Sequence, residues 1–316
     1  KGKSKEDIAI KDFRKECRTF ATEWIEAQKS SFKRLFVLAD WSNPYLTMDY
    51  ESEAIILEEF SKFFFNGSLY QGSKPVMWSP VEKTALAEAE IEYKDIKSTS
   101  IYVSFKIKST PKKILKDAYI IIWTTTPWTI PGNRAIAYGE DIDYCIFQIV
   151  ESDNKDLKGK KYIVAKILLK EVSEKCKIYN YKILDHIAGS DLQNIICEHP
   201  LFDIGYSYEI PLLKANFVEE SGGTGFVHIA PCYGEDDYLL AVDNKIEIKD
   251  ILEDNGCYKS DTPIFAGEHV FKAHTSIIKN LFEKKQLVGV LDYIHSYPHS
   301  WRSKKPVIFR TTPQWF

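Results

Sequence analysis

The spacing of apolar residues changes near Gly67, and this change limits the folds that the sequence can adopt. Before this glycine, apolar side chains recur every three or four residues, as in amphipathic helices: Phe13, Cys17, Phe20, Ala21, Trp24 and Ile25, then Ile55, Ile56, Phe60, Phe63 and Phe64. The turn residues Asn66 and Gly67 then close this region. We therefore expect a helical segment in the first ~65 residues.

After Lys74, short runs of β-branched and aromatic residues bounded by Pro, Gly or Asp replace the helical pattern. These runs predict strands at 101–107, 119–123, 144–149 and 307–309. Helical spacing returns near 163–172, 237–242 and 271–281. With 316 residues, 44% of them hydrophobic, the chain can bury a sizeable core in about two domains. The pattern predicts an α+β fold.

Charge and hydropathy exclude several classes of protein. The 42 Lys and Arg residues against 45 Asp and Glu residues give a net charge of −3, so the chain is not a polybasic nucleic-acid coat. Apolar runs such as 119–123 are far shorter than the ~20 residues of a membrane-spanning helix. The charged start at 1–7 lacks the features of a secretory signal, and the six cysteines are scattered. We expect a cytoplasmic protein without a membrane segment.

Three threonines follow the strand at 119–123, in the segment Trp123-Thr124-Thr125-Thr126-Pro127-Trp128-Thr129. A β-branched strand that ends in a turn would explain a bare threonine run. Hydroxyl groups at a strand end can also orient a water molecule and an ester through short hydrogen bonds. Both interpretations remain open from the residues alone.

A glycine turn precedes a second polar segment, GTGFVHIAPCYGEDDY from Gly223 to Tyr238. His228 alternates with Val227 and Ile229, so the spacing alone favours a hydrogen-bonded, half-buried histidine. The carboxylates of Asp236 and Asp237 are either turn and helix-capping charges or a partner for a substrate cation. The segment lacks the Lys-Ser/Thr pair of a phosphate-binding loop.

Two other kinds of chemistry have little support in the sequence. It contains no H-E-x-x-H motif and no paired cysteine spacing, so a metal centre is not expected. A Ser-His-Asp hydrolase is not favoured either, because the G-x-S-x-G nucleophile motif is absent.

Together, these segments resemble isoleucyl-tRNA synthetases. The resemblance is carried by WTTTPWTIPGNRAIA at 123–137, by the segment at 223–238 and by YPHSWRSKKPVIFRTTPQWF at 297–316, and it spans nearly the whole chain. Valyl and leucyl relatives usually have Arg where this chain has Thr126. The HIGH and KMSKS signatures of the aminoacylation site are absent from the sequence.

The resemblance implies the fold and the domain organisation. The chain would correspond to the insertion called connective peptide 1, a β-barrel-like editing domain with surrounding helices, joined to a catalytic core by a two-stranded stem. The implied boundaries are a helical segment at 1–73, the stem at 74–95 and 293–316, and the editing domain at 96–292.

The resemblance also implies an activity, the hydrolysis of mischarged valyl-tRNA(Ile). A missing methylene allows only roughly 150-fold discrimination, and isoleucyl-tRNA synthetase is itself the reference case for this limit. Asp237 would bind the α-ammonium group, His228 would limit the size of the side chain, and Thr125 with Asn133 would position the ester and water. The full set that it implies is catalytic Thr124, Thr125, Thr126 and Asp237, and substrate-binding Trp123, Thr129, Asn133, His228 and Ala230.

One departure from the family concerns metal binding. Many relatives have paired cysteines in both halves of the stem, which resemble a structural zinc site. This chain has Ser79, Glu82, Ser300 and Ser303 there, so we expect a stem without metal. We expect no cofactor for this region, since ATP would serve the catalytic core.

The expected partner is the 3′ acceptor end of tRNA(Ile) carrying valine, bound by a monomer. The alternative is a module that binds the acceptor end without catalysis. Its phosphate contacts would come from a basic cluster, which is otherwise a solvated face: Lys106, Lys108, Lys112, Lys113 and Lys116. A valyl-type hydrolysis of threonyl esters is disfavoured by Thr126 and by the HIAP stretch.

Overall fold

The computed structural model describes residues 7–316 and divides the chain into two compact units. One contains the chain up to Gln71 together with Trp315–Phe316, and the other is Gly72–Gln314. The residues expected to form the stem and the editing domain lie in the second unit, apart from the last two. Most of the charged start considered in the search for a secretory signal, Lys1–Glu6, lies outside the described residues.

The first unit contains the two helices that the sequence predicts, α1 (Ile10–Arg34) and α2 (Tyr50–Phe65). Arg18 connects them, because its Nη2 lies 2.7 Å from the Glu53 carboxylate. After α2, the chain turns at Gly67, whose φ of +81° is a conformation that glycine adopts readily. Neither helix contains a buried residue in the part of the chain that the structure describes.

The second unit is built on a ten-stranded mixed sheet, which contains the main hydrophobic core. Its strands follow the order β11-β5-β10-β9-β3-β4-β7-β6-β8, and β12 pairs with β3. Their bounds are β3 Ile91–Ser109, β4 Ala118–Thr124, β5 Ala135–Tyr138, β6 Asp143–Ser152, β7 Lys161–Ala165, β8 Ile178–Ala188, β9 Ile196–Glu198, β10 Glu209–Lys214, β11 Phe226–Ile229 and β12 Leu287–Ser300. This architecture confirms the predicted α+β fold class.

The large sheet folds back on itself but does not close into a barrel. Its terminal strands, β11 and β8, are not hydrogen-bonded to each other among the described residues. The sheet is therefore open, and the predicted barrel-like domain is not a closed barrel. At one end, β11 packs near β4, although these strands are far apart in the strand order. This folding brings the threonines at the end of β4 toward His228 on β11.

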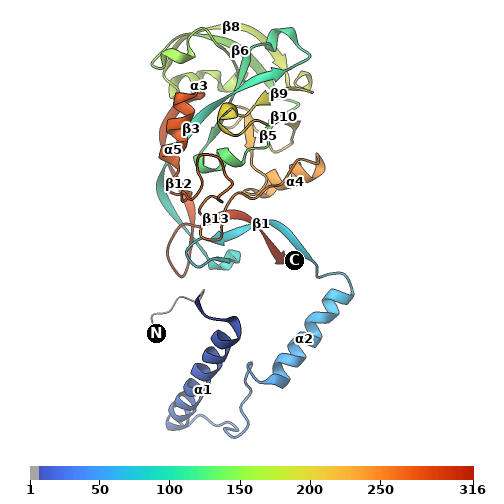
Figure 1. Cartoon of the computed structure of the whole chain (residues 1–316), viewed down its shortest axis with the longest axis vertical. Coiled ribbons are helices and arrows are strands. Elements are labelled where there is room, and N and C mark those ends of the chain that lie inside the picture. Colours follow the sequence, from blue (N-terminus) through green and yellow to red (C-terminus); the bar gives the residue numbers. More distant parts are fainter. Residues whose placement is uncertain (1–6) are drawn as a thin grey trace. The chain divides into compact units, whose positions relative to one another are not determined.

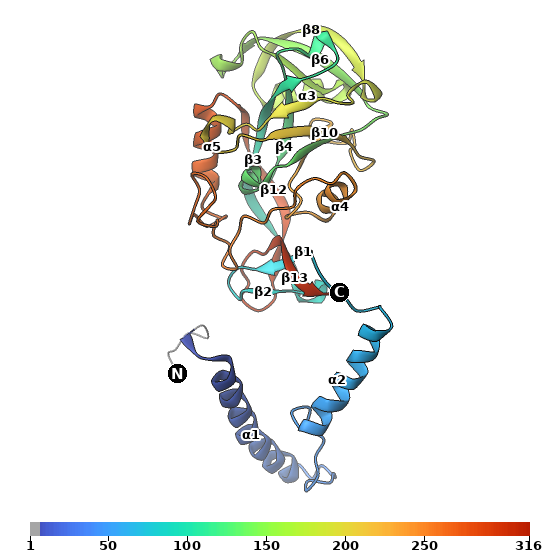
Figure 2. The ribbon, with the colours of Figure 1, turned by 45° about the vertical axis from the view of Figure 1, so that its right-hand side comes forward.

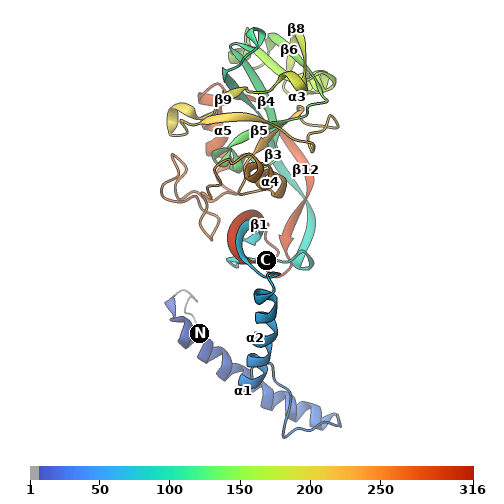
Figure 3. The same cartoon turned by 90° about the vertical axis from the view of Figure 1, so that its right-hand side faces the viewer.

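The residues that the resemblance assigns to the stem, called the stem below, lie in a small sheet and in part of a long two-stranded ribbon. The small sheet has the order β13-β1-β2, formed by β1 (Gln71–Ser79), β2 (Thr84–Ala85) and β13 (Ile308–Trp315). In the ribbon, β3 and β12 pair antiparallel from Ile91 opposite Ser300 up to Val103 opposite Leu287. Figures 1 and 3 show these two strands running together from the small sheet into the large one.

Three helices belong to the second unit: α3 (Leu169–Lys175), α4 (Glu235–Asp243) and α5 (His274–Glu283). Figure 2 shows α5 beside the β3 and β12 strands. The helix expected at 163–172 is wrong at its start, since residues 163–165 belong to β7. Pairing of β7 with both β4 and β6 buries this segment, so tertiary contacts override its helical spacing. No helix among the described residues is long and apolar enough to cross a membrane.

Candidate active site

A cavity of about 640 Å³ lies where the end of β4, β11 and the start of α4 meet. Eight of the nine site residues implied by the resemblance line this cavity: Trp123, Thr124, Thr125, Thr126, Thr129, His228, Ala230 and Asp237. They come from segments about a hundred residues apart in the sequence. The fold therefore gathers the two polar motifs around a single cavity.

The hydroxyl groups of Thr124, Thr126 and Thr129 form a connected hydrogen-bond network. Thr124 Oγ1 accepts from the Thr126 backbone N–H at 3.1 Å and lies 3.2 Å from Thr126 Oγ1. Thr129, in the 3₁₀ turn Pro127–Gly132 that follows β4, donates from Oγ1 to the Thr126 carbonyl at 2.8 Å. These bonds fix the positions of the hydroxyl groups that face the cavity.

His228 is held from behind on both ring nitrogens. Asn133 Nδ2 lies 2.6 Å from His228 Nδ1, and Thr129 Oγ1 lies 2.8 Å from Nε2. Burial lowers the pKa of His228 to about 3, so the imidazole is neutral near pH 7. Since the Asn133 amide donates to Nδ1, the proton lies on Nε2 and is donated to Thr129. The ring is thus a fixed wall and not a proton acceptor toward the cavity.

Asp237 lies in the first turn of α4 and lines the cavity. Its Oδ2 accepts a hydrogen bond from the Ala230 backbone N–H at 2.8 Å. Burial raises the pKa of Asp237 to about 6, although this hydrogen bond acts in the opposite direction. Asp236, by contrast, is exposed, and it does not line the cavity. A carboxylate in this position suits a cationic ligand, which would restore the stabilisation lost on burial.

Asn133 is the predicted site residue that the structure places outside the cavity wall. Its side chain is fully buried and donates to His228 Nδ1 and to the Ala135 carbonyl, the latter at 2.9 Å. In this position, it contacts the cavity only through the histidine ring that it orients.

Several cavity residues were missed by sequence reasoning because they belong to no motif. Glu171 and Lys175 come from α3, and their side chains form an ion pair at 2.5 Å. Tyr293, on β12, places its ring edge to face with Trp123, with centroids 5.3 Å apart. Phe217 also lines the cavity. No short sequence pattern connects these positions with the threonine segment, so only the fold reveals them.

The basic cluster expected for an acceptor-binding module is partly neutralised. Lys108 Nζ lies 2.9 Å from the Glu209 carboxylate, and Lys112 Nζ lies 2.6 Å from the Asp191 carboxylate. Two of its five cations therefore already have anionic partners. This arrangement favours the solvated-face interpretation of the cluster over a phosphate-binding surface.

The four stem positions at which the resemblance leads one to expect cysteines lie close together, and Glu82 is at their centre. Its carboxylate accepts hydrogen bonds from Ser79 Oγ, from Ser300 Oγ at 2.9 Å and from the Ser303 backbone N–H at 3.0 Å. Structural zinc sites are built from four thiolate and imidazole ligands, whereas this group offers serine hydroxyls and a single carboxylate. Among the described residues, no group of three or more His, Cys, Asp or Glu side chains is placed to hold a metal ion.

Comparison with known sequences identifies the family to which the chain belongs. The family model of class I tRNA synthetases (I, L, M and V) matches residues 1–316, and the chain belongs to this family. Within the family, the chain is similar to isoleucine–tRNA ligases. It is 49% identical to that of Pelagibacter ubique over 99% of this chain, and 46% identical to that of Gluconobacter oxydans over the whole chain. In both comparisons, the chain spans 34% of the relative's length.

Solved structures to which the chain is similar include the crystal structure of GlLeuRS-CP1 and that of the P. falciparum cytosolic leucyl-tRNA synthetase editing domain. The first is 17% identical to this chain with a TM-score of 0.46, and covers 60% of this chain and 97% of its own length. The second is 10% identical with a TM-score of 0.46, and covers 62% and 99% respectively.

Proposed function

We propose that the chain is the editing region of an isoleucyl-tRNA synthetase and hydrolyses the ester of valyl-tRNA(Ile). The observation that supports this proposal best is the convergence of the threonine segment, His228 and Asp237 on one cavity. Its natural partner in this proposal is the 3′ acceptor end of tRNA(Ile), bound by a monomeric chain. Aminoacylation is not proposed, because the HIGH and KMSKS signatures are absent from the sequence.

In this proposal, Asp237 holds the substrate by its α-ammonium group. The partly buried carboxylate has a pKa raised to about 6, so it is mostly ionised at pH 7 and lacks full solvation. An ammonium group that enters the cavity forms a charge-assisted pair with it and lowers its pKa. The fixed distance between Asp237 and the threonine segment then places the ester carbonyl beside the hydroxyl groups.

Hydrolysis in this site is assigned to a water molecule and not to a protein nucleophile. Thr124, Thr125 and Thr126 line the cavity, and their hydroxyl groups can hold the water and the ester in an attacking geometry. Fixed hydroxyl and backbone dipoles can also stabilise the developing negative charge on the carbonyl oxygen. The neutral His228 does not supply a general base, since both of its ring nitrogens are engaged away from the ester.

Selection against isoleucine is assigned to the ring of His228. The imidazole is buried and hydrogen-bonded to Thr129 and Asn133, so it cannot move aside without breaking those bonds. A clash with a rigid wall excludes the larger side chain, whereas a weaker attraction would only reduce its binding. Asn133 is assigned the role of holding this wall, and Trp123 and Ala230 complete the lining.

The test is a deacylation assay of the purified chain with valyl-tRNA(Ile) and isoleucyl-tRNA(Ile) side by side, each corrected for spontaneous hydrolysis. The expected result is faster hydrolysis of the valyl ester than of the isoleucyl ester. Binding of the tRNA without acceleration of either reaction would contradict the proposal and favour the non-catalytic acceptor-binding module.

A further inference from the structure

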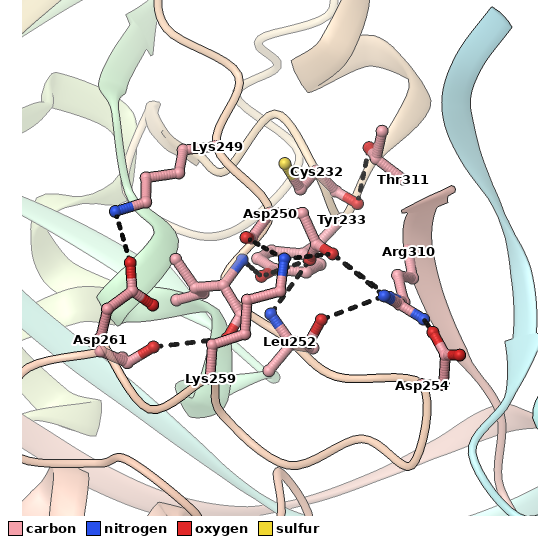
Figure 4. Close-up of polar contacts among 12 residues, drawn as sticks. Cys232, Tyr233, Lys249, Asp250, Leu252, Asp254, Lys259, Asp261, Arg310 and Thr311 are labelled. Carbon is pink, nitrogen blue, oxygen red and sulfur yellow. Dashed lines mark hydrogen bonds and ion pairs between the residues drawn. The ribbon is translucent and has the colours of Figure 1, made fainter. Parts of the chain in front are cut away.

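Arg310, on the returning stem strand β13, lies in a buried network outside the cavity (Figure 4). Its side chain is 8% exposed, and it donates from Nη1 to Asp254 Oδ1 at 2.6 Å and from Nη2 to Asp250 Oδ2 at 3.2 Å. Nη2 also donates to the Leu252 carbonyl at 3.1 Å. One guanidinium group therefore fixes the loop 250–254 at three points.

The other stem strand holds the same loop. Trp78, on β1, donates from its indole nitrogen to the Asp254 carbonyl at 2.8 Å. The Arg310 guanidinium carbon lies 5.0 Å from the centre of the Trp78 ring, within the range of a cation–π contact. The loop is thus attached to two strands of the small stem sheet, β1 and β13.

From this loop, contacts continue to the wall of the cavity. Asp250 uses one oxygen for Arg310, and its other oxygen accepts a bond from the Tyr233 hydroxyl at 3.4 Å. The Tyr233 hydroxyl in turn accepts from the Ile251 backbone N–H at 3.3 Å. Tyr233 lines the cavity, and its ring packs against Gly132 so closely that a Cβ atom there would lie 2.7 Å from it.

The strand also contacts the wall directly. Both the backbone N–H and the hydroxyl of Thr311 donate to the Cys232 carbonyl, at 2.9 Å and 3.3 Å. Cys232 and Tyr233 lie in the turn between Ala230, whose N–H binds the Asp237 carboxylate, and α4, which carries Asp237. This turn is therefore hydrogen-bonded to β13 through Cys232, and it is hydrogen-bonded to Asp237 through Ala230.

We infer that Arg310 and Thr311 are positioning residues for the editing site, acting through Asp250, Cys232 and Tyr233 on the turn that places Asp237. The inference rests on the proposed function, because Asp237 has a substrate only there. It assigns the stem a second role: its returning strand sets the geometry of the ammonium-binding wall. Displacement of β13 would alter the distance between Asp237 and the threonine segment.

The test uses the variant Arg310→Gln, with Lys249→Gln as the matched control. Lys249 directly precedes Asp250 in the sequence, and its exposed ion pair with Asp261, 3.1 Å long, does not involve Arg310 (Figure 4). Single-turnover hydrolysis of valyl-tRNA(Ile) is measured over a range of chain concentrations. Arg310→Gln should lower the saturating rate about tenfold while the half-saturating concentration changes less than about twofold, since the tRNA contacts remain. Lys249→Gln should match the wild type in both.

Amide hydrogen exchange supplies a readout that does not depend on activity. In Arg310→Gln, exchange should become faster over 230–237, whereas a general loss of stability would raise exchange throughout the second unit. Should Arg310→Gln fail to fold, Tyr233→Phe, which keeps the ring and removes only the hydroxyl, should show the same two effects at smaller size.

Unchanged rate and unchanged local exchange in the folded variant would overturn the inference. If the wild-type chain hydrolyses neither ester, the proposed function is refuted instead. In that case, amide hydrogen exchange over 230–237 in Arg310→Gln is the measurement that decides whether Arg310 positions the turn. Rates lowered together with uniformly faster exchange would mean that Arg310 is only structural, which also overturns the inference.

Discussion

Two carboxylates in this chain, Glu82 in the stem and Asp237 in the cavity, have opposite surroundings. Glu82 accepts hydrogen bonds from the hydroxyls of Ser79 and Ser300 and from the Ser303 backbone N–H, so its donors come from both halves of the stem. Asp237 accepts one from Ala230 N–H, and its pKa is raised to about 6 by burial. The stem thus satisfies its carboxylate with its own donors, whereas the cavity leaves its carboxylate in need of a cation.

This difference separates a structural role from a functional one. A carboxylate surrounded by donors stabilises the fold, because its hydrogen bonds compensate for lost solvation. A partly buried carboxylate without such compensation reduces stability, and active sites commonly contain groups of this kind. Removing each carboxylate should therefore have opposite consequences for stability and for activity.

The largest expected effect is that of Asp237→Ala on editing. Losing the carboxylate leaves the substrate ammonium without a counter-charge, at a cost of roughly 2–5 kcal/mol, so hydrolysis of valyl-tRNA(Ile) should be nearly abolished. The measurement is the single-turnover deacylation rate of a variant whose thermal unfolding remains cooperative. Asp236→Ala is the control and should hydrolyse at the wild-type rate. If Asp236→Ala is the inactive variant instead, the ammonium site is assigned to the wrong residue.

The pH profile should show the titration of Asp237. Protonation of this group removes the ammonium partner, so the deacylation rate at chain concentrations well below half-saturation, which reports the substrate-free site, should fall about tenfold per unit as the pH drops below about 6. His228 does not contribute to this decline, because burial lowers its pKa to about 3. A rate that is level between pH 7 and pH 5, measured on tRNA that stays folded, would contradict the assignment.

His228→Ala should change selectivity more than rate. Removing the ring opens space for one additional methylene, so the variant should gain hydrolysis of isoleucyl-tRNA(Ile), and the ratio of valyl to isoleucyl rates should fall by about 10-fold or more. The two rates are compared in variant and wild type under the same conditions. An unchanged ratio with both rates reduced would place the size filter elsewhere.

Glu82→Ala should act on stability and leave the editing rate nearly unchanged. The variant leaves buried Ser79 and Ser300 without their acceptor, which should lower the free energy of unfolding by roughly 1–3 kcal/mol. Chemical denaturation measures this change, and Glu88→Ala, at an exposed position, is the control. A stability equal to that of the wild type would mean that the Glu82 cluster does not hold the stem.

The same cluster predicts that chelators leave the melting temperature of the wild type unchanged and that the purified chain contains no stoichiometric zinc. A single tightly bound zinc per chain would refute the metal-free stem.

The sequence predicts the residues of the site better than their roles. The threonine segment and the 223–238 segment carried enough of the family pattern to identify the residues now found around the cavity. Asn133 could not be placed, because no pattern distinguishes a residue that lines a cavity from one that orients its neighbour. Tyr293 on β12 and Lys175 on α3 reach the cavity only because the whole sheet folds so that these elements lie beside the end of β4.

The stem shows a similar limit. The absence of the expected cysteines indicated which four positions lie close together in the stem. The hydrogen bonds found there depend on the rotamer of Glu82, which the sequence does not predict. The open sheet was also beyond prediction, since alternating apolar residues look the same in a closed barrel and in a sheet that folds back.

Asp237→Asn tests the central claim most directly, because it removes the charge and keeps the shape. The raised pKa means that the folded state binds the Asp237 proton more tightly than the unfolded state, in which the pKa is near 3.8. This contribution to stability is present at low pH and is lost as the pH rises through about 6. The variant should therefore exceed the wild type in unfolding free energy by roughly 1–3 kcal/mol at pH 7, with the gap opening between about pH 4 and pH 6.

The measurement is the unfolding free energy and the valyl-tRNA(Ile) deacylation rate of Asp237→Asn at pH 7, taken on the same preparation. We predict that stability rises and that hydrolysis is lost. A variant that is less stable than the wild type, or that still hydrolyses the valyl ester at the wild-type rate, would contradict the claim that this carboxylate is kept for a substrate cation.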